Sequence, residues 1–424
     1  MSELDKIPQS IPEAQAKKAL LEKGGVPHVY LGQGLIFVPP ESAMADYNEY
    51  LLSQGINPGD FPLDLLMRAG PGGAVFNSVR AEQVWKEMQK NQIGASGVRK
   101  PEAFQSTIYD GVSGKTVENL FGVDGGSIAT MQANDLQDGL RRIRSIIAHL
   151  GKGYISRVIL PKQYKYSGHT DFVNDAKLVG GDIAVTEIPE IQEDGSQDLQ
   201  TMRTEFEKIK SEGRVAILID QEMNNNASGW DRDPKLNEEL ASLLKEFEGT
   251  IFYVGDIAYK GLKEDVLEQY PLMQKLIEKG VPAFFYFSPT KLTFYRKPPS
   301  FKSIVFATPG GFADTKKLKD AFQGCQRAPG GIGCTDNGAI LMEKLSSDPE
   351  FLKEVRTLRL YLKYILASLG SNTNGIFRCR EPQVIQTLNS GSPQAVTVGQ
   401  RENIWPLGDP KLRALYQQAL KINA

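Results

Sequence analysis

One lysine stands where a run of apolar residues ends. Residues 284–300 read FFYFSPTKLTFYRKPPS, so the aromatic run stops at Ser288 and Lys291 follows three residues later. A lysine in such a place can be a surface residue whose stem lies on apolar surface while its ammonium stays in water. It can also be a nucleophilic amine that forms a Schiff base with a carbonyl group. Residues elsewhere in the chain have to decide between these interpretations.

A second candidate, Asp256, stands at the end of another apolar run, TIFYVGD (250–256). In open α/β sheets, ligands bind at the carboxyl ends of the strands, so a carboxylate there is a candidate general acid. The alternative is a solvated aspartate that caps the following helix. The loops after the apolar runs contain no Ser-His-Asp set, and the chain has neither GxxxxGK[ST] nor GxGxxG. An amine and a carboxylate at strand ends are therefore the chemistry that the sequence offers.

From about residue 120, short apolar strands alternate with helices, and these elements must position the two groups. Strands are predicted over 156–161, 180–189, 214–220, 250–256, 282–288 and 302–309, and helices over 136–150, 199–211, 234–247 and 264–279. This alternation is typical of βαβ units and a parallel sheet. The predicted fold is α/β, a three-layer sandwich with a mostly parallel central sheet.

The chain ends differ from this regular centre. Residues 70–116 are rich in glycine and polar residues, and we expect an irregular segment or insertion there. From about residue 310 the pattern turns mostly helical and then ends in short strands and a helix, which indicates a smaller α+β domain. The predicted large domain covers 46–309, and the predicted small domain, closing over the substrate, covers 1–45 and 310–424.

Composition excludes several classes of protein. The 424 residues carry a formal net charge of −2, which favours neither nucleic acid nor an anionic membrane surface as a partner. No apolar run is long enough to span a bilayer, and the polar N-terminus lacks the apolar core of a signal peptide. Three cysteines and three histidines provide neither a disulfide framework nor a histidine metal site. We therefore expect a cytoplasmic protein without a metal.

The order of the candidate residues along the chain resembles the aspartate aminotransferase-like family of fold type I pyridoxal-phosphate (PLP) enzymes. That family has an aromatic residue, an Asn-Pro-Thr-Gly loop, Asp-x-x-Tyr, Ser-x-x-Lys and a C-terminal Arg. The matching residues here are Tyr166, Asn226 in NASGWD, Asp256 and Tyr259 in DIAYKG, Ser288 and Lys291 in SPTK, and Arg401 in RENIWPL. The resemblance covers most of residues 109–410.

The resemblance implies that PLP is the cofactor and that Lys291 holds it as an internal aldimine and then acts as general base and acid. It implies that Asp256 pairs with the protonated pyridine nitrogen, with His169 supporting that carboxylate. Asn226 and Tyr259 would hydrogen-bond the phenolic oxygen of the ring. The catalytic residues would thus be Lys291, Asp256 and Tyr259.

The remaining implied residues bind the ring, the phosphate and the substrate. Tyr166 would stack on the ring. The phosphate would lie in a turn over 126–135, at the N-terminus of the following helix, where backbone amides bind anions. The implied phosphate ligands are Ser288, Arg296, Ala133, Asn134, Asp135 and, from a neighbouring subunit, Tyr109. The implied substrate contacts are Arg401, Gly34 and Arg327. Sharing Tyr109 between subunits implies a homodimer.

The residues leave three functions open. An aminotransferase would move nitrogen from an α-amino acid to a 2-oxo acid. A PLP-dependent lyase or synthase would use the same cofactor for elimination, replacement or carbon–carbon bond formation on an amino acid such as S-adenosylmethionine. A non-catalytic relative with an inherited fold is disfavoured, because Lys291 and Asp256 are both present. The aminotransferase is the preferred interpretation.

Overall fold

A computed structural model describes a large part of the chain. The described residues are 49, 52–53, 57, 69–70, 73–74, 78–92, 106–124, 128–162, 167–178, 183–192, 194–221, 232–258, 271–289, 303–326 and 336–356. The chain divides into two compact units, one of Gln83–Leu292 and Pro298–Leu352, and one of Met1–Glu82, Thr293–Lys297 and Lys353–Ala424. The domain boundaries expected from the sequence stay a prediction, because most of the second unit lies outside the described residues.

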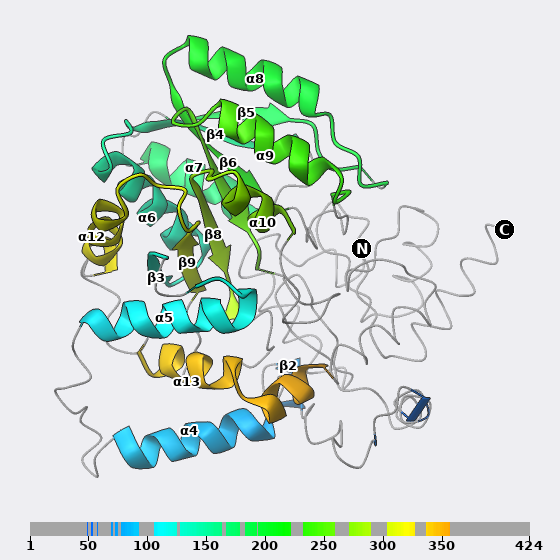
Figure 1. Ribbon diagram of the computed structural model, residues 1–424, viewed down its shortest axis with the longest axis vertical. Helices are drawn as coiled ribbons and strands as arrows, with labels where there is room; N and C mark the ends of the chain where they lie inside the picture. The colour runs from blue at the N-terminus through cyan, green and yellow to red at the C-terminus, as the bar shows by residue number, and fades with distance from the viewer. Residues whose placement is uncertain are drawn as a thin grey trace, which may run out of the picture. The chain divides into compact units, whose positions relative to one another are not determined.

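A seven-stranded mixed sheet forms the centre of the first unit (Figure 1). In spatial order its strands are β3 (Thr130–Ala133), β9 (Ser303–Ala307), β8 (Ala283–Phe287), β7 (Ile251–Asp256), β6 (Val215–Asp220), β4 (Ile155–Pro161) and β5 (Ala184–Ile188). Strand β9 is antiparallel to both of its neighbours, and the remaining neighbours are parallel. The prediction of a mostly parallel sheet is confirmed.

Helices cover both faces of this sheet. They are α6 (Leu136–His149), α7 (Ser167–Leu178), α8 (Leu199–Ser211), α9 (Leu236–Glu246), α10 (Pro271–Glu278) and α12 (Thr315–Gln326). Helix α6 packs against α7 and α12, and α9 packs against α8 and α10. Figure 1 shows these two groups on opposite sides of the strands. Because both faces are covered, β7, β8 and β9 are buried at every position, as their continuous apolar sequences require.

The six predicted strands correspond to β4 through β9, and the predicted helices correspond to α6, α8, α9 and α10. Strand β3 was missed, because residues 126–135 were expected to form a turn. Its four residues are all buried and pair with β9. A run this short, directly before a helix cap, carries too few residues to show a strand pattern.

The expectation of an irregular segment over 70–116 is wrong. Residues 70–116 contain α4 (Val79–Gln92) and most of α5 (Ser106–Phe121). The short antiparallel strands β1 (Ala69–Gly70) and β2 (Gly73–Ala74) precede these helices in the chain. Helix α5 packs against β3 and α13 (Asp336–Ser346). The ring of Phe121 lies 5.2 Å from the ring of Phe287, between centroids. This packing outweighs the low helix propensity of the two glycines within α5.

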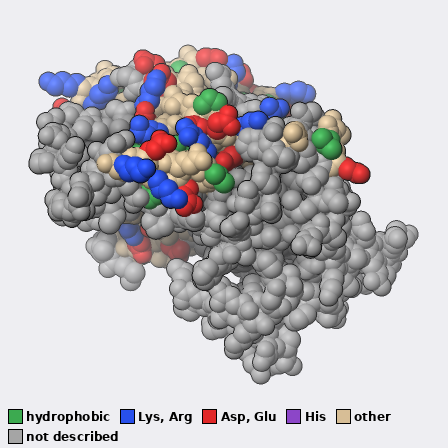
Figure 2. Space-filling view, turned by 90° about the horizontal axis from the view of Figure 1, so that it is seen from below, with side chains coloured by type: hydrophobic (Ala, Val, Ile, Leu, Met, Phe, Trp, Pro, Cys, Tyr) green, Lys and Arg blue, Asp and Glu red, His purple; other side chains and the backbone are tan. Residues whose placement is uncertain are grey.

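Surface features agree with a chain of near-zero net charge. Over the described part of the face in Figure 2, Lys and Arg side chains are interspersed with Asp and Glu side chains. None of the helices in the described residues is long and apolar enough to cross a membrane. The same residues contain no cluster of His, Cys, Asp and Glu that could hold a metal ion.

Candidate functional site

The parallel strands place four chain segments at one edge of the sheet, where their carboxyl ends meet. Strand β4 leads toward α7, which carries His169, while Gln221 directly follows β6. Asp256 is the last residue of β7, and Ser288 directly follows β8. Asp256 pairs in register with Tyr286 of β8. The edge therefore gathers polar residues that are far apart in the sequence.

Asp256 is the buried carboxylate of this edge, with 3% of its surface exposed. Gln221 Nε2 donates a hydrogen bond to Asp256 Oδ2 over 3.0 Å, and the backbone N–H of Ala258 donates to Oδ1 over 3.2 Å. His169 Nε2 lies 3.1 Å from Oδ2 and donates to it in the tautomer that carries its proton on Nε2. These contacts hold the carboxylate in one orientation.

The neighbouring strand ends in a second buried carboxylate, Asp220, which has a different environment. Arg232 Nη2 donates to both oxygens of Asp220, over 2.9 and 2.7 Å, and the hydroxyl of Tyr253 donates to Oδ2 over 3.0 Å. Tyr253 and Asp256 are three residues apart in one strand, so their side chains lie on opposite faces of the sheet. Asp220 thus points to the face opposite Asp256.

This contrast tests whether the site fits a cofactor with a cationic nitrogen. Burying a carboxylate is costly unless a positive charge and hydrogen bonds compensate it. Asp220 has that charge in Arg232, whereas among the described residues the sole ion-pair partner of Asp256 is His169. The protonated nitrogen of a pyridine ring would add both a positive charge and an N–H donor. The residues around Asp256 therefore fit the ring of PLP.

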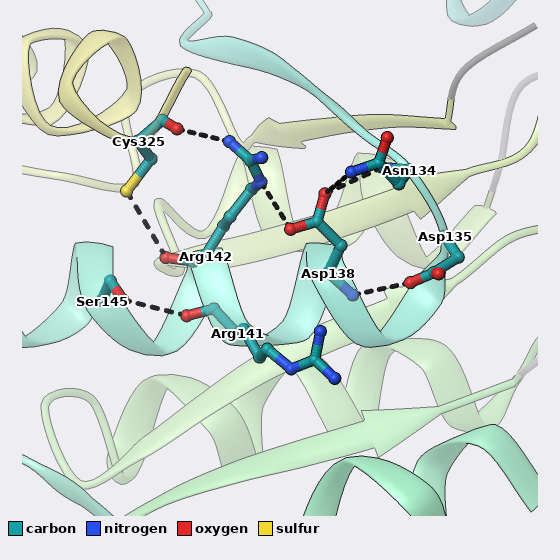
Figure 3. A network of polar contacts seen from close by, with 7 residues as sticks. All are labelled: Asn134, Asp135, Asp138, Arg141, Arg142, Ser145 and Cys325. Atoms are coloured by element: carbon teal, nitrogen blue, oxygen red, sulfur yellow. Dashed lines mark hydrogen bonds and ion pairs between the residues drawn. The ribbon is translucent and has the colours of Figure 1, made fainter. Parts of the chain in front are cut away.

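The N-terminus of α6, where the phosphate was expected, contains two carboxylates (Figure 3). Asp135 caps the helix by accepting from the backbone N–H of Asp138 over 2.8 Å. Asp138 Oδ2 accepts from the backbone and side-chain nitrogens of Asn134, over 2.9 and 3.0 Å. Ala133 is buried at the end of β3. Two of the local backbone N–H groups are thus already hydrogen-bonded to carboxylates.

Arg142 partly balances this negative charge. Its Nε donates to Asp138 Oδ1 over 2.9 Å, and its Nη1 donates to the carbonyl of Cys325 at the end of α12. Burial raises the pKa of the Cys325 thiol above its usual value. The positive charge of nearby Arg142 partly opposes this shift. The arginine therefore links α6 to the last turn of α12.

Of the predicted site residues, His169, Asp256, Ser288, Ala133, Asn134 and Asp135 are described. The backbone of Tyr109 lies in α5. The predicted residues outside the described ones are Lys291, Tyr259, Asn226, Tyr166, Arg296, Arg401, Gly34 and Arg327. The structure brings His169 and Asp256 together, 87 residues apart in sequence.

Sequence reasoning missed two residues of this region, Gln221 and Arg232. Gln221 follows a strand end just as Asp256 occupies one, so its position was a usable signal. Arg232 offered no such signal, because it lies in no strand and its contact with Asp220 exists only in the folded chain.

No family model and no curated protein matches the sequence. The structure is nevertheless similar to those of many solved aminotransferases. The aromatic amino acid aminotransferase of Psychrobacter sp. B6, crystallised with aspartic acid, is 14% identical with a TM-score of 0.61, over 92% of this chain and 98% of that chain. The aspartate aminotransferase of Plasmodium falciparum is 13% identical with a TM-score of 0.60, over 82% and 88%.

A third structure contains the cofactor itself. The aromatic-amino-acid aminotransferase of Burkholderia pseudomallei, covalently bound to pyridoxal phosphate, is 14% identical with a TM-score of 0.53, over 84% of this chain and 82% of that chain. At such low identity the similarity establishes the fold. The chain has the fold of the aromatic and aspartate aminotransferases, which is that of the fold type I PLP enzymes.

Proposed function

We propose that this chain is a PLP-dependent aminotransferase that moves the amino group of an α-amino acid to a 2-oxo acid. The observation that carries the proposal is Asp256, a buried carboxylate at a strand end that has no Lys or Arg partner among the described residues. The aminotransferase fold supports it. When bound, PLP supplies an electron sink for the bonds at the substrate Cα.

Asp256 has the role of holding a proton on the pyridine nitrogen. The carboxylate would accept that N–H, while Gln221 and Ala258 keep its oxygens oriented by the hydrogen bonds already present. His169 adds a second side-chain donor from α7. Because Gln221 and Ala258 donate from neutral amides, they orient the carboxylate without balancing its negative charge.

We assign the other residues of the proposed site from their order along the chain. Lys291 carries the cofactor and moves the proton at the substrate Cα. Arg401 binds the substrate α-carboxylate through two parallel hydrogen bonds. Asn226 and Tyr259 donate to the phenolic oxygen of the ring. Tyr166 stacks on the ring, and Gly34 and Arg327 contact the substrate.

The phosphate would be bound between Ser288, Arg296 and the N-terminus of α6, as the sequence predicts. The carboxylates of Asp135 and Asp138 lie at that terminus and have already taken two of its N–H groups. Arg296 must therefore supply most of the positive charge. Tyr109 from a second copy of the chain would complete the phosphate site, so we propose a homodimer.

Amino-group transfer can be measured directly. The protein with PLP is mixed with a panel of α-amino acids and an isotopically labelled 2-oxo acid, and mass spectrometry detects the new labelled amino acid. We expect transfer in the wild type and its loss in Lys291→Ala. Absence of transfer with every donor contradicts the proposal. Release of a substituent from the amino acid side chain without amino transfer would instead indicate a lyase or synthase.

A further inference from the structure

A buried ion pair joins the two ends of the connection between β6 and α9. Asp220 is the last residue of β6, and Arg232 lies shortly before α9. The side chain of Arg232 is 0% exposed and that of Asp220 is 6% exposed. The Arg232 guanidinium donates to both oxygens of Asp220, over 2.9 and 2.7 Å. The pair thus holds together two residues that lie 12 positions apart in the chain.

Other parts of the chain hold this ion pair. Arg232 Nε donates to Gln197 Oε1 over 2.9 Å, and Gln197 Nε2 donates to the carbonyl of Pro189 over 2.9 Å. The hydroxyl of Tyr253, on β7, donates to Asp220 Oδ2 over 3.0 Å. The guanidinium is therefore connected to β6, β7 and the segment between β5 and α8, which gives it one position.

Gln221 stands next to Asp220 in the chain and points the other way. Successive side chains of an extended strand lie on opposite faces, so fixing Asp220 on one face directs Gln221 to the other. There Gln221 Nε2 donates to Asp256 Oδ2 over 3.0 Å. The orientation of Gln221 toward Asp256 is thus linked to the ion pair on the far face.

Stability alone does not account for this arrangement. Replacing a buried ion pair by apolar residues of similar volume is often neutral or stabilising, because two charges must lose their water. What the charged pair adds is orientation, since its hydrogen bonds are directional and apolar contacts are not. That orientation is passed to the residue that contacts Asp256.

We propose that Arg232 is a positioning residue: through Asp220 it orients Gln221, which in turn holds Asp256. The expected effect on PLP binding rests on the proposed function, because Asp256 is taken as the partner of the PLP nitrogen. The positioning of Asp256 by Arg232 rests on described contacts alone, from Arg232 to Asp220 and from Gln221 to Asp256.

The test removes the ion pair without leaving a buried charge. The paired variant is Asp220→Leu with Arg232→Met, and the single variant is Gln221→Met. The triple variant combines them, and a matched control removes the exposed ion pair between α8 and α9 by Arg203→Met with Glu246→Leu. Absorbance titration measures the dissociation constant for PLP, and the urea midpoint reports on folding.

We expect the paired variant and Gln221→Met each to weaken PLP binding by about 10-fold, the lower end of the loss seen when a partner that orients a metal ligand is removed. Because both act through the same contact, the triple variant should bind no more weakly than Gln221→Met alone. A general structural role would instead multiply the two losses to about 100-fold, which would overturn the proposal. The control variant should bind PLP as the wild type does.

Amide hydrogen exchange without cofactor separates this proposal from the proposed function. The backbone N–H of Ala258 donates to Asp256, so loosening Asp256 should speed exchange at Ala258 in the paired variant and not in the control. Unchanged exchange there overturns the inference, even if the wild type binds PLP. If the wild type binds no PLP, the proposed function is wrong and exchange at Ala258 alone decides the inference.

A variant that keeps the charge covers the case in which the paired variant does not fold. Arg232→Lys retains the ion pair but loses the planar guanidinium that bonds both Asp220 and Gln197. We expect a urea midpoint near that of the wild type with faster exchange at Ala258. Wild-type exchange at Ala258 in Arg232→Lys would contradict the proposal.

Discussion

At the scale of single residues, Asp256 and Asp220 show how two carboxylates at adjacent strand ends acquire different roles. Both are buried, and both accept hydrogen bonds from side chains on other elements. Asp220 forms an ion pair with the guanidinium of Arg232, whereas the described contacts of Asp256 come from amides and an imidazole. Charge balance, more than burial, therefore marks Asp256 as the residue that would contact a ligand.

Asp256→Asn tests this assignment. The amide is nearly the same size but removes the negative charge and places an NH2 group against N–H donors, which leaves donors unmatched. We expect PLP binding to weaken about 10- to 100-fold, measured by absorbance titration. Asp171→Asn, an exposed carboxylate on α7, is the control and should bind normally. Normal binding by Asp256→Asn would contradict the assignment.

Gly255, directly before Asp256, is required by packing. A Cβ atom there would lie 2.7 Å from Cδ1 of Phe285 and 3.1 Å from Cε1 of Tyr253. We expect Gly255→Ala to lower the free energy of unfolding by about 1–3 kcal/mol in urea titrations.

The matched control for Gly255 is Gly324→Ala. Gly324 lies in α12, and nothing stands within 4 Å of a Cβ added there. This change should raise the free energy of unfolding by about 0.5–1 kcal/mol, because glycine is a poor helix former. Equal effects of the two substitutions would show that the contact with Phe285 is relieved without cost.

At the scale of elements, strands and helices with local signals were predictable. The predicted helix over 199–211 matches α8 residue for residue, because its apolar spacing and its cap are both local. Helix α5 was not predictable, because its stability comes from packing on β3 and α13. Most of the predicted PLP ligands stay predictions, since their segments lie outside the described residues.

The cap of α8 makes its stability depend on pH. Asp198 accepts hydrogen bonds from the hydroxyl and the backbone N–H of Thr201, and these lower its pKa below 3.8. A lowered folded-state pKa means that the ionised carboxylate stabilises the helix above the unfolded-state pKa. This stabilisation is lost as the pH falls through the folded-state pKa.

Asp198→Asn isolates that charge, because asparagine is also a good N-cap. We expect the wild type to have the higher urea midpoint at neutral pH, and the difference to shrink as the pH falls below 3.8. A difference that is the same at neutral and acidic pH would show that the charge of Asp198 contributes nothing.

At the scale of the whole molecule, a ligand that binds the folded state should stabilise the chain. With free PLP at 100 times its dissociation constant, mass action adds about 2.7 kcal/mol to the free energy of unfolding. Calorimetry of the wild type with and without PLP checks this. Inorganic phosphate is the control for general anion binding, and an equal shift with phosphate would contradict a specific site.

The sequence by itself determined the α/β class, the order of strands β4 to β9 along the chain and the position of Asp256 at a strand end. These features follow from the local spacing of apolar residues, which can be read without knowing which distant residues are in contact. The tertiary structure decided which side chains meet: His169 with Asp256, Gln221 with Asp256, and Arg232 with Asp220. The physical reason is that strand pairing joins segments far apart in sequence and assigns each strand-end side chain to one face of the sheet.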